Sequence, residues 1–263
     1  MILFNKYPGG KKKAVTMSFD DGYREDRKLI EIFNTYGIKG TFHINSGLLY
    51  RDIRVDADEV KEIYEGHEIS AHGFTHTTLS LLPQHGIVDE IMNDRRELER
   101  LSGKIIRGMS YPNGINPPHI VDTVRHCGIE YSRTTASTNT FALPQDFLLW
   151  HPTCHHLHSE DAAERFVKPG AQELGQLLCI WGHSTEFEMA GNWSLIERVS
   201  EKLANCNDIW FATCIDLYDY ITASRRVRVS LDNKIIENPT NLDIWFTCDE
   251  ETKCVKAGET LYL

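Results

Sequence analysis

Short apolar runs alternate along most of the chain with segments whose apolar positions recur every three to four residues. Runs of the first kind are typical of buried strands, and the second spacing is typical of helices that cover a sheet. We predict strands at residues 14–19, 40–44, 68–72, 105–111, 129–133, 177–182 and 209–213. We predict helices near residues 24–36, 56–65, 87–102, 117–127, 159–168, 193–205 and 215–223.

Strands that alternate with helices favour a parallel sheet with crossover helices, so we predict the α/β class. Seven strand–helix units within about 220 residues fit a barrel better than a long open sheet. The pattern changes after residue 225, where short alternating segments flank Asp232 and Asn233 and predict a β-hairpin. We therefore expect a barrel over residues 1–225 and a small β-hairpin appendage over residues 226–263.

The charge balance narrows the range of partners. The chain has 28 Lys and Arg against 38 Asp and Glu, a net charge of −10, which disfavours binding to nucleic acids and anionic membranes. It has 7 cysteines, an odd number without CxxC spacing, which we interpret as reduced thiols. The first residues lack a signal-peptide pattern and no apolar run reaches about 18 residues, so we expect a soluble cytoplasmic protein.

Polar side chains gather where the predicted strands end. The carboxyl ends of parallel strands open on one face of a barrel, and active sites lie on that face. Residues that are far apart in the sequence should therefore meet there. The strand-end residues are Asp20, Asp21, His72, His76, the segment 111–114, Arg133 and His183.

Four of these segments resemble, in order and spacing, the motifs of the NodB-homology polysaccharide deacetylases. They read SFDDG at 18–22, HGFTH at 72–76, YPNG at 111–114 and LCIWGH at 178–183. The resemblance covers roughly residues 12–222. It implies a distorted (β/α)7 barrel and the metal-dependent removal of N- or O-linked acetyl groups from a carbohydrate.

The resemblance implies that Asp21, His72 and His76 hold a metal ion. One carboxylate and two imidazoles suit Zn²⁺, and three protein ligands leave a position open for water or substrate. We therefore expect Zn²⁺ as the cofactor, with another divalent ion such as Co²⁺ as a substitute. The competing interpretation is a turn carboxylate at Asp21 beside two hydrogen-bonded surface histidines.

Two further residues match the acid and base of the family. Asp20 matches the general base, which takes a proton from the attacking water, and His183 matches the histidine that protonates the leaving group. A helix N-cap is the alternative role for Asp20. A hydrogen-bonded core histidine is the alternative for His183.

The third motif departs from the family pattern, because Ser110 stands where the family has an arginine that positions the catalytic aspartate. We hypothesise that Arg133, at the end of the neighbouring predicted strand, takes over this role through paired hydrogen bonds. The alternative is an ion pair between Arg133 and a surface acid. The family's fourth motif, a Trp and Asp pair that tunes the histidine, has no clear counterpart.

The remaining candidates concern the substrate. Asn113 corresponds to the position whose backbone N–H contributes to the oxyanion hole, although a plain turn would also explain it. Tyr111 and Trp181 are candidate substrate contacts. One or two of the aromatic residues Trp150, Trp181, Phe187 and Trp193 are expected to stack on a sugar. We interpret the histidine-rich stretch 150–158 as a pocket-lining loop, with an inert surface as the alternative. A second metal site is disfavoured, since the spacing does not bring ligands together.

The function that we predict is metal-dependent deacetylation, with an acetylated carbohydrate as the substrate. Two alternatives remain open: a related amidohydrolase that acts on a small amide other than a sugar, and an inactive barrel that only binds glycans. Asp20 argues against the inactive barrel, because a pure binding protein has no use for a base.

Overall fold

The computed structural model describes residues 1–168 and 175–263 and centres on one parallel sheet. The sheet has the strand order β6-β5-β4-β3-β2-β8-β7, and β9 also pairs with β2. Its strands are β2 (Lys13–Asp20), β3 (Gly40–Ile44), β4 (Glu68–Ala71), β5 (Gly108–Ser110), β6 (Tyr131–Arg133), β7 (Cys154–His155), β8 (Gln176–Gly182) and β9 (Ile209–Phe211).

The sheet curves into an incomplete barrel. A parallel bridge between Arg133 and Trp150 joins the end of β6 to the segment that leads into β7, so the two outer strands approach each other. The central strand β2 is buried along nearly its whole length, as expected for a strand with packed side chains on both faces. The prediction of an α/β, distorted (β/α)7 barrel is confirmed.

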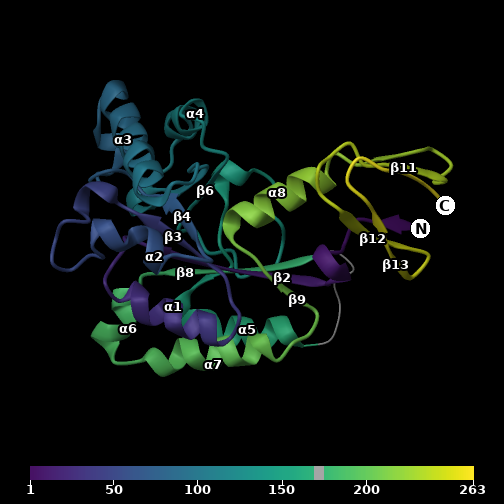
Figure 1. Ribbon diagram of the computed structural model, residues 1–263, viewed down its shortest axis with the longest axis horizontal. Coiled ribbons are helices and arrows are strands. Elements are labelled where there is room, and N and C mark those ends of the chain that lie inside the picture. Colours follow the sequence, from purple (N-terminus) through teal and green to yellow (C-terminus); the bar gives the residue numbers. More distant parts are fainter. Residues whose placement is uncertain (169–174) are drawn as a thin grey trace.

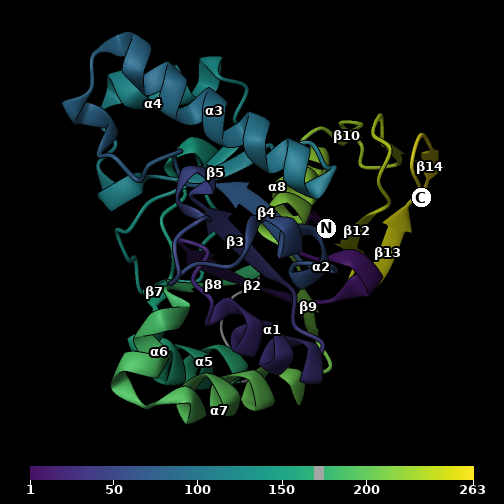
Figure 2. The same cartoon turned by 60° about the vertical axis from the view of Figure 1, so that its left-hand side comes forward.

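Helices cover the outside of the barrel in two groups (Figures 1 and 2). α1, α5, α6 and α7 lie along one side of the sheet, and α3 and α4 lie on the other. The helices are α1 (Asp26–Thr35), α2 (Val60–Ile63), α3 (Gln84–Ser102), α4 (Pro118–His126), α5 (Ser159–Val167), α6 (Ser184–Ala190), α7 (Trp193–Ala204) and α8 (Cys214–Ser224). No helix of the described residues is long and apolar enough to cross a membrane.

Most predicted elements are present, with three differences. The helix predicted at 56–65 is shorter, a 3-10 turn at Ala57–Glu59 followed by α2. The two-residue strand β7 and the helix α6 were not predicted, because each is too short to show a repeating apolar pattern. All seven cysteines are free, in agreement with reduced thiols.

The C-terminal segment forms two small antiparallel sheets beside α8. Their orders are β1-β12-β13 and β10-β11-β14. The strands are β1 (Ile2–Leu3), β10 (Arg228–Val229), β11 (Ile235–Glu237), β12 (Ile244–Cys248), β13 (Glu251–Val255) and β14 (Thr260–Tyr262). The N-terminal β1 pairs with β12, and Figure 1 shows both chain ends on this side. The division at residue 225 stays a prediction, with the addition that β1 pairs with the C-terminal segment.

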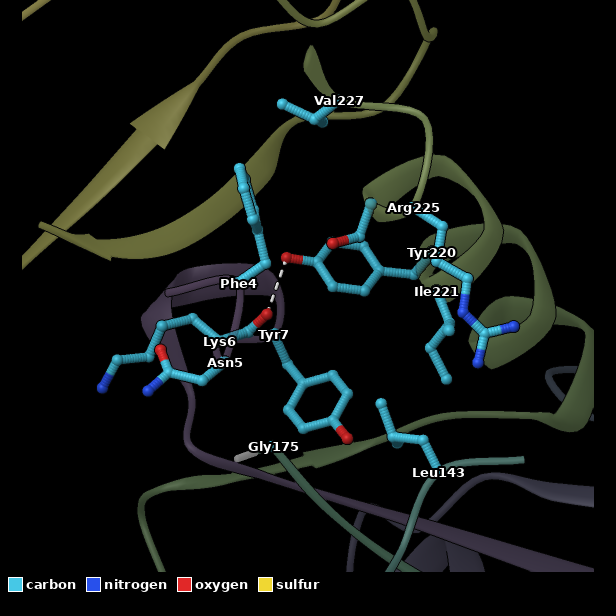
Figure 3. Close-up of a pocket in the computed structure, with 11 residues that line it drawn as sticks. Phe4, Asn5, Lys6, Tyr7, Leu143, Gly175, Tyr220, Ile221, Arg225 and Val227 are labelled. Atoms are coloured by element: carbon cyan, nitrogen blue, oxygen red, sulfur yellow. Dashed lines mark hydrogen bonds between the residues drawn. The ribbon is translucent and has the colours of Figure 1, made fainter. Parts of the chain in front are cut away.

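A cavity of about 280 Å³ lies between the N-terminal segment and α8 (Figure 3). Beside it, the Tyr220 hydroxyl donates a hydrogen bond to the Lys6 carbonyl at 2.9 Å. Tyr7 and Gly175 line it and precede β2 and β8, so the cavity lies near the amino ends of these strands. The candidate catalytic residues follow the carboxyl ends of the strands, at the opposite edge of the sheet.

Candidate metal and catalytic site

The three predicted metal ligands meet at the carboxyl edge of the sheet. Asp21 follows β2 and His72 follows β4, while His76 lies four residues further on. Asp21 Oδ1 lies 3.7 Å from His72 Nε2 and 3.5 Å from His76 Nε2, and one ligand atom from each residue falls within 4.8 Å of the others. Asp21 Oδ1 is buried without a hydrogen-bond partner, as expected of an oxygen that binds a cation.

Hydrogen bonds orient His72 for metal binding. Its Nδ1 lies 2.9 Å from the Ser110 carbonyl oxygen, which places the ring hydrogen on Nδ1 and leaves the lone pair of Nε2 facing Asp21. Burial lowers the pKa of His72, and this keeps the ring in the neutral form that coordinates metals. The donor set and its orientation therefore fit a divalent metal ion.

Arg54, which the sequence did not single out, fixes the turn that carries Asp21. Its Nη1 donates to the Asp21 carbonyl at 2.6 Å and lies 3.7 Å from Asp21 Oδ2. The guanidinium carbon stands 3.9 Å from the centre of the Tyr23 ring, so the side chain is held by stacking as well. Asp21 has a φ of 84°, and these contacts help to hold that strained conformation.

The structure places Arg133 against Asp20, as hypothesised. Asp20 is the last residue of β2, and the Arg133 guanidinium donates to both of its carboxylate oxygens. Arg133 Nε also donates to Ser18 Oγ at 2.9 Å, and Ser110 Oγ donates to Asp20 Oδ1 at 3.0 Å. Ser110 thus supplies one hydrogen bond, while an adjacent strand supplies the cation.

The charge state of Asp20 follows from these contacts. Burial alone would raise the pKa of the carboxyl group, but the Arg133 charge, aided by nearby histidines, holds that pKa well below its ordinary value. Asp20 is therefore ionised, as a proton acceptor must be. Its role as a base stays a prediction.

His183 lies near the second carboxylate oxygen of Asp21, whereas His72 lies near the first. Its Nε2 is 4.0 Å from Asp21 Oδ2, and its Nδ1 is 3.1 Å from Glu186 Oε1. Burial opposes protonation of the ring, but the Glu186 hydrogen bond and the charges of Asp20 and Asp21 give a net rise in its pKa. The sequence analysis missed Glu186, because the short helix α6 on which it lies was not predicted. Its position three residues after His183 was the one signal that the sequence offered.

The predicted substrate residues separate into two groups. Asn113 is exposed with a φ of 58°, and its amide donates to Thr78 Oγ1 at 2.8 Å. The Trp181 ring is partly exposed beside the site, with the Arg133 guanidinium 4.8 Å from its centre. Tyr111 is buried and its hydroxyl donates to the Leu148 carbonyl at 2.8 Å, so this side chain faces the core instead of a substrate.

The other aromatic candidates pack in the core. Trp150, Phe187 and Trp193 are all buried, which leaves Trp181 as the member of that group with an exposed face. Their burial follows the usual behaviour of aromatic residues in a closed fold.

The amino-acid sequence matches the polysaccharide deacetylase family model over residues 8–132. It is 34% identical over 115 residues to a chitin deacetylase of Arthroderma benhamiae, which covers 42% of this chain and 29% of that protein. It is also 32% identical over 81 residues to a probable peptidoglycan-N-acetylglucosamine deacetylase of the same organism, and the match covers 30% of this chain and 18% of that protein. The chain therefore spans less than a third of the length of these relatives.

Solved structures support the same fold. A polysaccharide deacetylase from Mycobacterium smegmatis has a TM-score of 0.63 at 16% identity, over 84% of this chain and 93% of the other. A family 4 acetyl xylan esterase from Clostridium thermocellum, solved with a cobalt ion, has a TM-score of 0.54 at 17% identity, over 78% of this chain and 90% of the other. These structures show the fold alone, and together with the match over residues 8–132 they make the chain similar to the polysaccharide deacetylases in sequence and in fold.

Proposed function

We propose that this protein is a metal-dependent hydrolase that removes acetyl groups from a carbohydrate. The observation that carries the proposal is the unpaired, buried Oδ1 of Asp21, which faces two imidazole nitrogens beside an ionised Asp20. The relatives named as chitin and peptidoglycan deacetylases support an acetylated sugar as the substrate.

Asp21, His72 and His76 would hold the metal ion, and their one-carboxylate, two-imidazole set favours Zn²⁺. A divalent ion at this position would supply Lewis-acid chemistry: it would lower the pKa of a water molecule and polarise the acyl oxygen of the substrate. Burial of Asp21 and His72 excludes bulk water from the side of the site that faces the barrel.

Asp20 would accept the proton of the attacking water. Its two oxygens are held by Arg133 and Ser110, so the carboxylate keeps one orientation and stays ionised. A base that is fixed beside its target loses little entropy when the reaction begins.

His183 would return a proton to the leaving nitrogen or oxygen of the sugar. Glu186 accepts the hydrogen of Nδ1, so Nε2 is the ring nitrogen that faces the metal ligands. The raised pKa of His183 favours the protonated ring that an acid catalyst requires.

Acetate release by the zinc-loaded protein tests the proposal. The substrates would be N-acetylated and O-acetylated oligosaccharides, with a small amide other than a sugar as the comparison. We expect release from the sugars, and a 10²- to 10⁴-fold lower kcat with unchanged metal content in Asp20→Asn. Acetate release from the small amide alone would show that the substrate is not a carbohydrate. Binding of the sugars without acetate release would show that the protein is an inactive, glycan-binding barrel.

The role of His183 has its own test. His183→Ala should slow the hydrolysis of amides more than that of activated esters, because an activated leaving group needs no proton. Equal losses on both kinds of substrate would remove His183 from the acid role.

A further inference from the structure

Three histidines surround the carboxylate of Glu186. His155 Nε2 lies 3.2 Å and His156 Nδ1 lies 3.3 Å from Glu186 Oε2, while His183 Nδ1 lies 3.1 Å from Oε1. His155 ends β7, His183 follows β8 and Glu186 lies in the first turn of α6. The cluster is thus assembled from separate segments, which explains why spacing within 150–158 did not reveal it.

Several buried polar atoms of this cluster have no hydrogen-bond partner. His156 is fully buried, and neither of its ring nitrogens has a hydrogen-bond partner. Glu186 Oε2, toward which His156 Nδ1 points, has none either. Buried polar atoms without partners are uncommon in folded proteins and often mark the place of an ion or a water molecule.

The separations fit a metal ion. In a tetrahedral zinc site with bonds of about 2.0–2.1 Å, neighbouring ligand atoms lie about 3.3 Å apart. One ligand atom each of His155, His183 and Glu186 falls within 4.8 Å of the others. The Glu186 carboxylate lies 3.2 Å from His155 Nε2 through Oε2 and 3.1 Å from His183 Nδ1 through Oε1. Their side chains are 20%, 25% and 37% exposed, so an ion can enter from solvent.

We propose that His155, His183 and Glu186 form a second binding site for a divalent metal ion. The buried His156, next to Glu186, is available as a fourth ligand. Two or three imidazoles and one carboxylate favour Zn²⁺ over the hard cations, which prefer oxygen ligands. Binding there would break the hydrogen bond between Glu186 and His183, and the proton of His183 Nδ1 would be released to solvent. The second ion is therefore held less tightly than the ion at Asp21, His72 and His76.

The two sites are coupled because His183 belongs to both. Its Nε2 faces Asp21 Oδ2 at 4.0 Å, while its Nδ1 would coordinate the second ion. This consequence rests on the proposed function: a ring that is coordinated at Nδ1 is no longer a protonated imidazolium and cannot act as the acid. Zinc beyond one equivalent should therefore inhibit deacetylation.

Counting bound zinc tests the site without reference to activity. Metal-free protein would be titrated with Zn²⁺ by calorimetry, and the bound metal measured after removal of free ions. We expect two equivalents in the natural chain, the second at least ten-fold weaker, and one equivalent in His155→Ala and in Glu186→Gln. His158→Ala is the matched control, since His158 lies in the same stretch but is exposed and outside the cluster, and it should keep two.

A single equivalent in the natural chain would overturn the second site, and so would two equivalents in both variants. If His155→Ala and Glu186→Gln each bound no zinc at all, the proposal would also be overturned, because the two sites would then not be separate. Acetate release measured at one and at five equivalents of zinc tests the inhibition, and equal rates would contradict it. Absence of acetate release at every zinc level would count against the proposed function, while the metal count still decides the second site.

Discussion

At the scale of single residues, the pairing of Arg133 with Asp20 makes the sharpest prediction. Arg133→Ala leaves a buried carboxylate without its cation, which should destabilise the fold by about 3–5 kcal/mol. We propose that Arg133 acts on the reaction through Asp20, so its removal should add little to the loss of kcat caused by Asp20→Asn. Kinetics of the two single variants and the double variant measure this coupling.

Arg133→Lys is the control for this cycle. Lysine keeps the positive charge but cannot donate two parallel hydrogen bonds, so we expect a loss of kcat between those of the natural chain and Arg133→Ala. Fully additive losses in the double variant would show that Arg133 does not act through Asp20.

The buried carboxyl group of Asp26 should make the free energy of unfolding depend on pH. Burial raises the pKa of this carboxyl group to about 7, although hydrogen bonds from Tyr64 and Ser184 oppose the rise. The folded state therefore binds a proton that the unfolded state has already lost, and the free energy of unfolding falls as pH rises from about 4 to about 7. The loss amounts to at most about 4 kcal/mol.

Asp26→Asn removes this titration and should flatten the stability profile in that window. Urea unfolding of both proteins at pH 5 and pH 8 measures the difference. The natural chain should lose more stability than Asp26→Asn between the two values, whereas equal losses would show that Asp26 is ionised throughout.

The residues of the site differ in how far the sequence revealed them. Asp20, Asp21, His72, His76 and His183 stand directly after strands or in short motifs, so their convergence could be predicted. Arg54 could not be predicted, because the partners of an arginine in a loop are known only from the fold. Glu186 offered its spacing of three residues from His183, but that spacing alone does not show the contact. The hydrogen bond that the buried Tyr111 makes could not be predicted either, since its acceptor, the Leu148 carbonyl, lies 37 positions away.

At the scale of elements, the long helix α3 supports the proposed metal site through one carboxylate. Asp94 Oδ2 accepts the backbone N–H of His72 at 2.8 Å, and Asp94 Oδ1 accepts both donors of Ser46. These hydrogen bonds connect the end of β4 to α3 and fix the position of the His72 backbone, from which the ring extends. The sequence predicted α3 from its apolar spacing, but not this polar contact on its buried face.

Asp94→Ala should weaken zinc binding about ten-fold or more, because support behind a metal ligand is commonly worth that much. Asp89→Ala is the matched control on the same helix, since Asp89 is exposed, and it should leave zinc binding unchanged. Competition with a chelator measures both. Equal affinities for zinc in Asp94→Ala and the natural chain would mean that β4 holds His72 without the help of α3.

At the scale of the whole molecule, the barrel and the C-terminal sheets share a core beside α8. Ile244, Phe246 and Val255 are fully buried and pack in one cluster with Leu217 and Tyr220 of α8. The barrel could be predicted because its units repeat. The pairing of β1 with β12 could not be predicted. It joins the two ends of the chain, and neither end has a sequence pattern that indicates which strand it pairs with.

Phe246→Ala tests whether this core is separate from the chemistry. We expect a loss of about 3–5 kcal/mol in the free energy of unfolding, from the lost burial and the remaining cavity. The kcat per folded molecule should not change, because all proposed catalytic residues lie before residue 184. A lower kcat in fully folded protein would place the C-terminal sheets in contact with the site.

The central claim is that the acetyl group is removed by a metal held at Asp21, His72 and His76. The most direct measurement is acetate release from an acetylated oligosaccharide by metal-free protein, before and after one equivalent of Zn²⁺ is added. We predict no release from the metal-free protein and full recovery at one equivalent. Equal release from the metal-free protein, or no release from protein that contains one bound zinc, would contradict the claim.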